Sequence, residues 1–229
     1  MFPVVPWDEF KESFRWKQGE HVMAVAPTGA GKTTLLSELI PMRKYSIFLG
    51  TKKDDKLYRE IVRKHGFVRV ESMDEIKPWE NRIMLWPHHL KTIPQTYAVQ
   101  RNAFKHALDI TAEQGGWTLW ADELKYMSEH LRMSHEWTYA LEQFRSIGGT
   151  IIGGAQRPAW LPLSALSNAS HVFLWKTNFS DDAKRLADIG GIDAKAVTAE
   201  MHTLGRHEFI YIQTRGTEAR IVRTQVERH

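Results

Sequence analysis

Two kinds of hydrophobic pattern alternate along the chain. Short apolar runs rich in β-branched and aromatic residues predict strands, and longer segments whose apolar residues recur with a helical period predict helices. The predicted strands are 21–26, 45–50, 83–86, 117–122, 150–155 and 171–175. The predicted helices are 31–40, 54–65, 95–114, 134–147 and 181–189. Such alternation is typical of an α/β fold in which helices cover a mainly parallel sheet.

The C-terminal part of the chain has a different pattern. Residues 208–213 and 219–226 are apolar runs on either side of the turn sequence TRGTE, which predicts a β-hairpin that closes the fold. We expect residues 1–20 to form an N-terminal extension that packs on the core, and residues 21–229 to form one domain that includes the hairpin. A chain of 229 residues is too short for two nucleotide-binding domains of roughly 200 residues each.

Composition narrows the location of the protein. The sequence has no uninterrupted apolar run of the roughly 18 residues that a bilayer-spanning helix needs. Its N-terminus lacks the charged start and apolar core of a signal peptide. The absence of cysteine excludes disulfides and cysteine-based zinc sites. We therefore expect a soluble cytoplasmic protein that has no membrane partner.

Charge is unevenly distributed along the sequence. Residues 41–70 contain nine Lys or Arg against three Asp or Glu, a local net charge of +6, whereas the whole chain carries only +4. A local excess of positive charge favours a polyanionic partner such as DNA. The alternative, that these charges form the solvated face of a helix, remains equally open.

The segment AVAPTGAGKTT at 24–34 predicts a phosphate-binding loop between a buried strand and a helix. Successive backbone N–H groups and the helix dipole favour an anion at this position. Lys32 is placed to reach the β- and γ-phosphates of a nucleotide, and the hydroxyl of Thr33 to ligate Mg²⁺. Ala26 departs from the usual first glycine, which matters only if that position needs a positive φ. The expected nucleotide-binding residues are Pro27, Thr28, Gly29, Ala30, Gly31, Lys32, Thr33 and Thr34.

A second motif agrees with the loop. The apolar strand WTLWAD ends in Asp122, and Glu123 follows directly. Asp122 is expected to hold Mg²⁺, and Glu123 is expected to polarise the attacking water, which indicates hydrolysis of ATP. Two carboxylates at the end of a strand can also cap a helix, and the phosphate-binding loop is what favours the catalytic interpretation.

An alanine at the first loop position is also found in superfamily 2 helicases, whose first two motifs are similar to these segments. Such helicases need a second domain that places arginines across the cleft, and they commonly have a Ser-Ala-Thr triplet after the carboxylates. Neither is found in the sequence.

Residues 144–175, FRSIGGTIIGGAQRPAWLPLSALSNASHVFLW, point elsewhere. In this segment a helix delivers Arg145, a strand ends at Gln156, and Arg157 begins a loop with a proline. Together with the two earlier motifs, the segment resembles the FtsK–HerA superfamily of ring-forming, DNA-pumping P-loop ATPases. The resemblance covers most of residues 20–175 and implies a single P-loop NTPase domain of the RecA-like, ASCE type.

The resemblance assigns roles to individual positions. It matches Lys32, Thr33, Asp122, Glu123 and Gln156 one by one. The matching glutamine is a sensor that can hydrogen-bond the attacking water or a phosphate oxygen. An arginine shortly before the sensor strand is expected to enter the site of a neighbouring subunit, as an arginine finger does. This pattern favours Arg145 for that role and leaves Arg157 as the competing candidate.

The same resemblance implies a function. It predicts a homo-oligomeric ring, a pentamer or hexamer, that uses ATP and Mg²⁺ to move double-stranded DNA through contacts with the backbone. Because the chain lacks the extra elements of cellular members, it looks like the compact ATPases that package viral and phage genomes. A viral protein of this kind is expected in the host cytoplasm, and a portal or procapsid is its candidate partner. A cellular or plasmid translocase of the superfamily is the alternative. The candidate DNA-binding residues are Lys52, Lys53, Lys56, Lys91 and Arg101.

Two other classes of function stay open from the sequence. A nucleotide-switched assembly or extrusion protein would bind a partner protein instead of DNA and would show no salt-sensitive DNA affinity. A small-molecule phosphotransferase would need a lid with clustered arginines, and Glu123 after the metal-binding aspartate argues for water as the acceptor.

Overall fold

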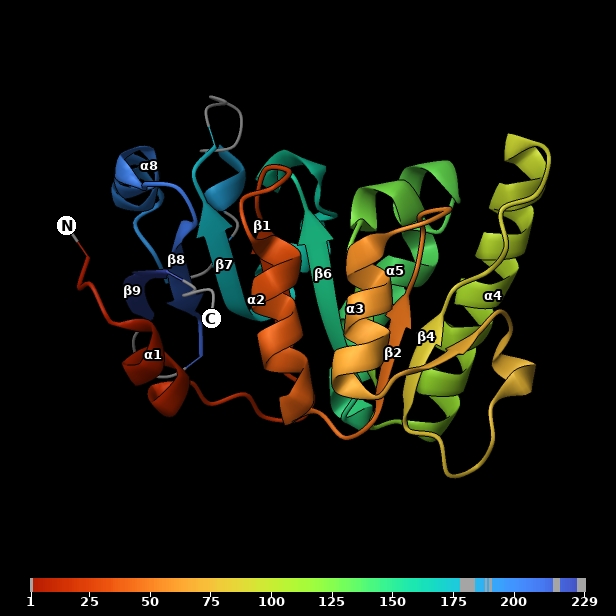
Figure 1. Cartoon of the computed structure of the whole chain (residues 1–229). Helices are drawn as coiled ribbons and strands as arrows, with labels where there is room; N and C mark the ends of the chain where they lie inside the picture. The colour runs from red at the N-terminus through yellow and green to blue at the C-terminus, as the bar shows by residue number, and fades with distance from the viewer. Residues whose placement is uncertain (1, 178–183, 188, 190, 216–218, 226–229) are drawn as a thin grey trace.

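The fold is a nine-stranded, mainly parallel sheet with helices on both faces (Figure 1). The computed structural model describes residues 2–177, 184–187, 189, 191–215 and 219–225. The strands are β1 (His21–Val25), β2 (Ser46–Leu49), β3 (Val68–Val70), β4 (Arg82–Leu85), β5 (Thr118–Ala121), β6 (Thr150–Ala155), β7 (Ala169–Trp175), β8 (Glu208–Gln213) and β9 (Arg220–Gln225). Their order in the sheet is β3-β4-β2-β5-β6-β1-β7-β8-β9. Among the described strands, the antiparallel pairings are those of β8 with β7 and with β9.

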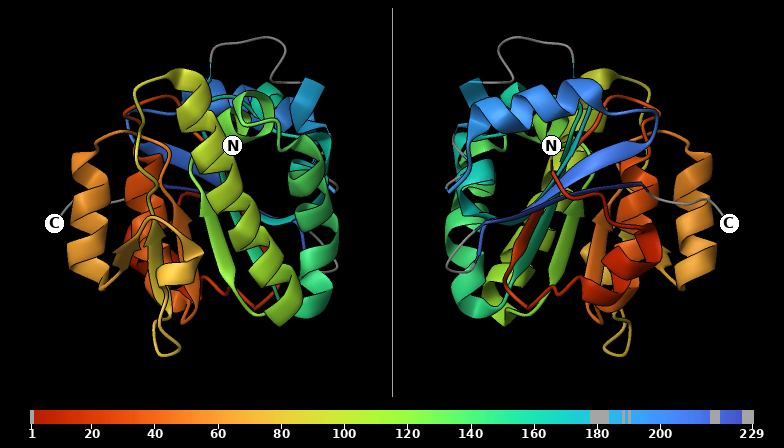
Figure 2. Two further views of the ribbon diagram at one scale, coloured as in Figure 1. Left: turned by 90° about the vertical axis from the view of Figure 1, so that its right-hand side faces the viewer. Right: turned by 90° about the vertical axis from the view of Figure 1, so that its left-hand side faces the viewer.

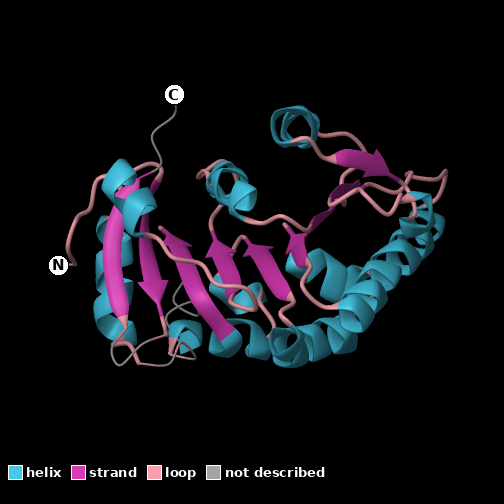
Figure 3. Ribbon diagram, turned by 90° about the horizontal axis from the view of Figure 1, so that it is seen from below, coloured by secondary structure: helices cyan, strands magenta, loops and turns pink. Residues whose placement is uncertain are grey.

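Helices lie on both faces of the sheet, as the views from the side and from below show (Figures 2 and 3). The α-helices are α1 (Trp7–Ser13), α2 (Lys32–Leu39), α3 (Lys56–His65), α4 (Ile93–Gln114), α5 (Ser134–Gln143), α6 (Leu163–Asn168) and α8 (Ala194–Thr203). A π-helical segment at Tyr126–His130 and a 3₁₀ helix at Phe144–Ile147 accompany them. Among the described residues, no helix has both the length and the apolar character that crossing a membrane requires.

The two faces of the sheet build two separate hydrophobic cores. Successive strand residues point to opposite faces, so that a buried strand contributes to both cores. In β1, Met23 packs in the core that contains Phe104 of α4 and Trp137 of α5. Its neighbour Val22 packs in the other core, which contains Leu36 of α2. This two-sided burial explains why the parallel strands are continuous apolar runs in the sequence.

The ends of the helices follow local sequence signals. The Asp55 carboxylate caps α3 by accepting hydrogen bonds from the N–H groups of Leu57 and Tyr58, and Gly66 ends the helix with a φ of 66°. Such a left-handed residue is what glycine supplies most readily. Gly148, with a φ of 70°, ends the 3₁₀ helix that follows α5 in the same way.

The strand order decides where polar residues can meet. The strand β6 lies between β1 and β5. The carboxyl ends of these three parallel strands therefore lie side by side, at the upper edge of the sheet in Figure 1. In open parallel sheets, ligands bind at this edge.

Most predicted elements are present, with shifted ends. All six predicted strands and the two strands of the hairpin form, and the pairing of β8 with β9 is antiparallel as expected. The predicted helix 134–147 is wrong in its second part, because the α-helix stops at Gln143 and tightens into a 3₁₀ turn. Of the predicted helix 181–189, residues 184–186 are helical, whereas 181–183 and 188 lie outside the described residues, as does the centre of the TRGTE turn.

The sequence pattern did not predict α1, β3, α6 or α8. Both α1 and α6 have fewer than eight residues, and β3 has three, two of which are exposed. Such short segments carry too little periodicity to be recognised. The longer α8 has an Asp193 cap that accepts hydrogen bonds from the N–H groups of Lys195 and Ala196.

The N-terminal extension is held by aromatic packing. On α1, the ring of Phe10 lies 5.0 Å from that of Tyr211 and 6.3 Å from that of Phe173. Val4 forms a β-bridge with Arg223 of β9. Residues 2–16 therefore cover the antiparallel end of the sheet.

Candidate functional site

The loop between β1 and α2 has the backbone geometry that an anion-binding turn needs. Gly29 has a φ of 79° and Gly31 a φ of 109°, conformations that side chains with a Cβ rarely adopt. Gly31 caps α2, so the first free N–H groups of the helix face the loop. Among the described non-glycine residues only Arg132 and His207 have positive φ. Ala26 therefore needs no glycine, and its N–H donates to the carbonyl of Ala155.

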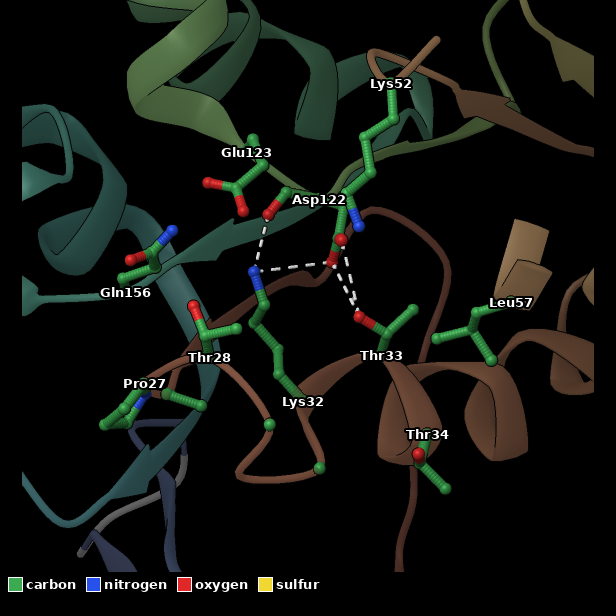
Figure 4. Close-up of a pocket in the computed structure, with 13 residues that line it drawn as sticks. Pro27, Thr28, Lys32, Thr33, Thr34, Lys52, Leu57, Asp122, Glu123 and Gln156 are labelled. Atoms are coloured by element: carbon green, nitrogen blue, oxygen red, sulfur yellow. Dashed lines mark hydrogen bonds and ion pairs between the residues drawn. The ribbon is translucent and has the colours of Figure 1, made fainter. Parts of the chain in front are cut away.

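The first two residues of α2 contact the end of β5. The Lys32 ammonium donates a hydrogen bond of 2.6 Å to the backbone carbonyl of Asp122 and lies 3.4 Å from the Asp122 Oδ1. The Thr33 hydroxyl lies 3.3 Å from each carboxylate oxygen of Asp122. Lys32 and Asp122 are both buried, at 8% and 3% exposure. These contacts fix the lysine and the carboxylate at the centre of the site (Figure 4).

A cavity of about 240 Å³ opens around these contacts. In Figure 4, Glu123 and Gln156 lie on one side of the Lys32 ammonium, and Thr33 lies on the other. Glu123 and Gln156 are both half-buried, so their polar ends are open to a ligand. The lining residues are Ala26, Pro27, Thr28, Gly29, Gly31, Lys32, Thr33, Thr34, Lys52, Leu57, Asp122, Glu123 and Gln156. The predicted loop, carboxylate pair and glutamine thus meet in one place.

Gly154 makes this convergence sterically possible. A Cβ at Gly154 in β6 would lie 2.2 Å from the Asp122 carbonyl oxygen and 2.8 Å from the Lys32 Nζ. Both distances are shorter than any ordinary contact, so only glycine lets the ammonium and carbonyl lie against β6. The run IIGGA shows that glycine interrupts the strand, but only the structure shows what approaches it.

Lys52 and Leu57 line the cavity without having been predicted to bind nucleotide. Lys52 follows β2 by three residues, and β2 pairs with β5, whose end carries Asp122. In Figure 4 the Lys52 side chain extends into the cavity on the Thr33 side. We predicted Lys52 as a DNA contact, which stays a prediction, and the structure places it at the lining of this cavity.

His207 contacts the phosphate-binding loop from the far end of the chain. Its Nδ1 lies 3.0 Å from the Ala30 carbonyl oxygen, across 177 positions of sequence. Because a carbonyl can only accept, Nδ1 carries the proton in this hydrogen bond. His207 has a φ of 68°, which is uncommon outside glycine. No local sequence signal predicts this contact.

Arg145 lies at the opposite edge of the sheet from the cavity. It belongs to the 3₁₀ helix that precedes β6, whereas Gln156 follows β6. Its backbone packs against Gly19, where a Cβ would lie 3.0 Å from the Arg145 carbonyl oxygen. The side chain is exposed and does not line the cavity of its own chain.

Arg157 directly follows Gln156 at the cavity edge. Its guanidinium carbon lies 5.8 Å from the centre of the Trp160 ring. It is half-buried, in contrast to the exposed Arg145.

The remaining candidate DNA contacts differ in whether their charged groups are exposed or already bonded within the chain. Lys53, Lys56 and Lys91 are exposed. The guanidinium of Arg101 is engaged within the chain, because it donates to the carbonyls of Leu131 and Arg132 and pairs with the carboxylate of Glu136 at 2.8 Å. A DNA contact by any of these four side chains remains a prediction.

The donor atoms beside Lys32 fit a magnesium ion. The hydroxyl of Thr33 and the carboxylate of Asp122 are hard oxygen ligands, which Mg²⁺ prefers, and they converge in the structure. The described residues contain no separate cluster of three or more acidic or histidine side chains that could hold a metal. The ion would supply positive charge next to the phosphates of a bound nucleotide.

The same fold occurs in solved structures of other proteins, two of which are described as ATPases. The DNA-packaging ATPase B204 of Sulfolobus turreted icosahedral virus matches with a TM-score of 0.65 at 14% identity, over 93% of this chain and 100% of that chain. VirB4 of Thermoanaerobacter pseudethanolicus matches with a TM-score of 0.70 at 10% identity, over 91% of this chain and 89% of that chain. The cytoplasmic domain of the type VII secretion ATPase EccC of Thermomonospora curvata matches with a TM-score of 0.56 at 16% identity, over 99% of this chain and 28% of that chain.

These likenesses establish the fold. No protein-family model matches the sequence, and no curated protein matches it. The predicted P-loop NTPase fold, with a mainly parallel sheet flanked by helices and a C-terminal hairpin, is confirmed. These structures share the fold, and membership of the FtsK–HerA superfamily stays a prediction.

Proposed function

We propose that this protein is an ATPase that couples hydrolysis to the movement of double-stranded DNA, as a homo-oligomeric ring of five or six subunits that packages a viral genome. One observation carries the ATPase part of the proposal. Lys32, Thr33, Asp122, Glu123 and Gln156, selected from three separate motifs, line a single cavity beside an anion-binding loop. A buried cation, two carboxylates and an amide around one phosphate site are the groups that phosphoryl transfer to water requires.

Each side chain has a distinct task in this proposal. Lys32 moves from Asp122 to the β- and γ-phosphates when nucleotide binds, and its charge stabilises the negative charge of the transition state. Glu123 orients the attacking water and receives its proton. The Gln156 amide hydrogen-bonds the water or a γ-phosphate oxygen, and it loses that partner when phosphate leaves. Asp122 and Thr33 would hold Mg²⁺.

The place of Arg145 supports a role between subunits. Within one chain Arg145 lies at the edge opposite the cavity, so it could act only on a neighbour's site. A guanidinium that enters the next subunit's site makes hydrolysis depend on assembly. Arg157, at the cavity edge, is the alternative and would act within its own subunit or across the interface.

The DNA part of the proposal rests on charge and on the solved structures. Lys53 and Lys56 lie in the basic segment 41–70 and are exposed, as is Lys91 in a separate loop. The B204 protein that shares the fold is described as a DNA-packaging ATPase, and a related B204 structure contains the ATP analogue AMPPCP. We assign backbone contacts to these lysines, without recognition of base sequence.

A second candidate function is nucleotide-driven secretion or assembly of a protein. The likeness to the secretion ATPase EccC favours this alternative. The two functions differ in whether DNA stimulates hydrolysis and in whether binding falls steeply with salt.

The experiment is an ATPase assay on the purified protein with and without linear duplex DNA. We expect DNA to stimulate hydrolysis, Lys32→Ala to lower kcat by at least about a hundredfold, and Arg145→Ala to lower it by about a thousandfold. Arg15→Ala is the matched control, because Arg15 is exposed and, within the described part of the chain, donates to the nearby carbonyls of Glu12 and Phe14. An ATPase that is indifferent to DNA but stimulated by a partner protein would support the second candidate.

Mixing two inactive variants tests whether Arg145 acts on a neighbour. In a mixed ring, a Lys32→Ala subunit supplies an intact Arg145 to a neighbouring Arg145→Ala subunit, whose own Lys32 is intact. We expect this mixture to recover activity. Failure to recover, with both variants still assembled, would contradict action between subunits. The same mixture made with Arg157→Ala shows whether Arg157 acts within its own subunit.

A further inference from the structure

The backbone around Lys52 is held in place by side chains from other elements. The Lys52 carbonyl accepts a hydrogen bond of 2.6 Å from the Trp86 indole N–H. The carbonyl of Thr51 accepts one of 3.0 Å from the amide of Gln100, which is fully buried. A Cβ at Gly50 would lie 3.0 Å from the Trp86 ring. Any movement at this position is therefore a movement of the Lys52 side chain.

The Lys52 ammonium is paired with a carboxylate that already has another task. Its Nζ lies 2.6 Å from the Asp55 Oδ2, while the Asp55 Oδ1 caps α3. Burial would raise the pKa of Asp55, but the Lys52 ammonium and the two capping N–H groups outweigh it and lower that pKa. Because the cap uses only Oδ1, Lys52 can leave Oδ2 without uncapping the helix.

The two lysines of the cavity are held in parallel ways. Lys32 is paired with Asp122, and Lys52 with Asp55. The Lys52 pair is more open, with 45% of the lysine side chain exposed against 9% for Lys32. An ion pair whose lysine is this exposed is weaker than a buried one, so exchanging Asp55 for a phosphate oxygen costs less at Lys52 than the same exchange would cost at a buried pair.

We propose that Lys52 is a second phosphate-contacting residue, whose ammonium leaves Asp55 for the terminal phosphate of a bound nucleoside triphosphate and returns when that phosphate is lost. This inference rests on the proposed ATPase function and names a further group of the same site. The exchange places a nucleotide-dependent contact three residues before the cap of α3 (Lys56–His65), the basic helix of the segment 41–70. The state of the nucleotide thereby reaches that helix through one side chain.

Lys53 is the neighbour that makes the inference testable. It is exposed and does not line the cavity, although it has the same charge and the adjacent position. If the segment only binds DNA, Lys52 and Lys53 should behave alike. If Lys52 contacts the terminal phosphate, only Lys52 should discriminate a triphosphate from a diphosphate.

The experiment measures the affinities of AMPPCP and ADP, both with Mg²⁺, for the full chain and its variants by calorimetry. A hydrogen bond between charged groups implies that Lys52→Gln weakens AMPPCP binding about ten- to a hundredfold. ADP binding should change by less than about threefold, because ADP lacks the contacted phosphate. Lys52→Arg keeps the charge and should retain most of the preference for AMPPCP. Lys53→Gln should leave both affinities unchanged.

The variant Asp55→Asn tests the other partner of the Lys52 ion pair. Asparagine still caps a helix, but it no longer holds the ammonium by charge. We expect this variant to bind AMPPCP at least as tightly as the unmodified protein does.

Several outcomes would overturn the inference. An unchanged AMPPCP affinity in folded Lys52→Gln would do so, and so would equal losses for AMPPCP and ADP. Equal effects of Lys52→Gln and Lys53→Gln would return Lys52 to the DNA interpretation. Failure of the proposed function itself looks different, because the unmodified protein and Lys32→Ala would then bind AMPPCP equally weakly.

Discussion

The two edges of the parallel sheet use polar side chains in different ways. At the carboxyl edge, Lys32 and Lys52 each face a cavity and each hold a carboxylate that has a second role. Glu123 and Gln156 lie there half-buried. A bound nucleotide can replace these pairings, because phosphate oxygens offer the lysines an equivalent partner.

At the amino edge, two buried histidines are bonded to other side chains or to backbone. His21 is fully buried, with Nε2 3.1 Å from the Leu141 carbonyl and Nδ1 accepting the Ile151 N–H at 3.0 Å. The ring of His171 lies between the carboxylate of Glu20 and the hydroxyl of Tyr211, at 3.0 Å and 2.8 Å. These bonds join residues more than 100 positions apart, except for the 40 positions between His171 and Tyr211.

Polar side chains therefore have two different roles in this sheet. Satisfied buried networks stabilise a single arrangement, whereas pairs that can be exchanged around a cavity leave room for a ligand. Changes at the amino edge should therefore alter stability without altering nucleotide affinity, and changes at the carboxyl edge should alter both.

The largest expected effect is a loss of folding stability in acid, and it comes from a buried histidine at the amino edge. Burial lowers the pKa of His21 from 6.5 to about 4, so the unfolded chain takes up this proton at a higher pH than the folded chain does. Stability is therefore lost as the pH falls from 6.5 towards 4, by about 3 kcal/mol from this group. Denaturant unfolding at pH 7.5, 6 and 4.5 measures the loss.

The variant His21→Gln should show a shallower dependence on pH, and His202→Gln, at an exposed histidine, should not. At pH 7.5, His21→Gln should bind nucleotide normally. An unchanged slope in His21→Gln would show that another group controls acid stability.

The next largest effect is expected from substitutions of glycine at the two ends of β6, which should lower stability by different amounts. Gly154→Ala, at the carboxyl end of β6, places a Cβ 2.2 Å from the Asp122 carbonyl. Gly149→Ala, before the amino end, places one 3.0 Å from the Phe144 Cβ. Overpacking should lower the free energy of unfolding by about 1–3 kcal/mol at Gly154 and by less at Gly149.

Only Gly154→Ala should also weaken nucleotide binding, because it displaces Lys32 and Asp122. Thermal unfolding and nucleotide titration measure both quantities. If Gly149→Ala weakened binding as much, the separation of the two edges would be wrong.

The smallest expected effect is on nucleotide affinity, and it tests whether His207 belongs to the proposed nucleotide site. His207→Asn keeps a residue that tolerates positive φ, but its shorter side chain does not reach the Ala30 carbonyl. The loss of one hydrogen bond, worth about 0.5–1.5 kcal/mol, predicts a weakening of nucleotide affinity of about two- to tenfold. Titration with AMPPCP measures this change. Equal affinity in His207→Asn would place the C-terminal hairpin outside the site.

The sequence predicted most of the fold and the centre of the site, because both depend on local signals. The residues of the phosphate-binding loop are contiguous, and Asp122 and Gln156 each follow a recognisable buried strand. The first alanine of the loop is compatible with the site because Ala26 has no positive φ.

The missed features depend on contacts between distant segments. Gly154 matters because of what approaches it, Lys52 because β2 pairs with β5, and His207 because the chain returns to the loop. No local pattern encodes such contacts. The short elements α1 and β3 were missed for a related reason, since packing defines them more than propensity does.

By itself, the sequence determined that a glycine-rich loop followed by lysine and threonine, a carboxylate pair and a strand-end glutamine exist in one α/β chain. Hydrophobic periodicity and glycine placement are local properties, so they can be read along the chain. The tertiary structure decided that β6 lies between β1 and β5 and that Arg145 is at the edge opposite the cavity. It also decided that Lys52 lines the cavity. These facts depend on strand order and on burial, which arise only when segments far apart in the sequence pack together.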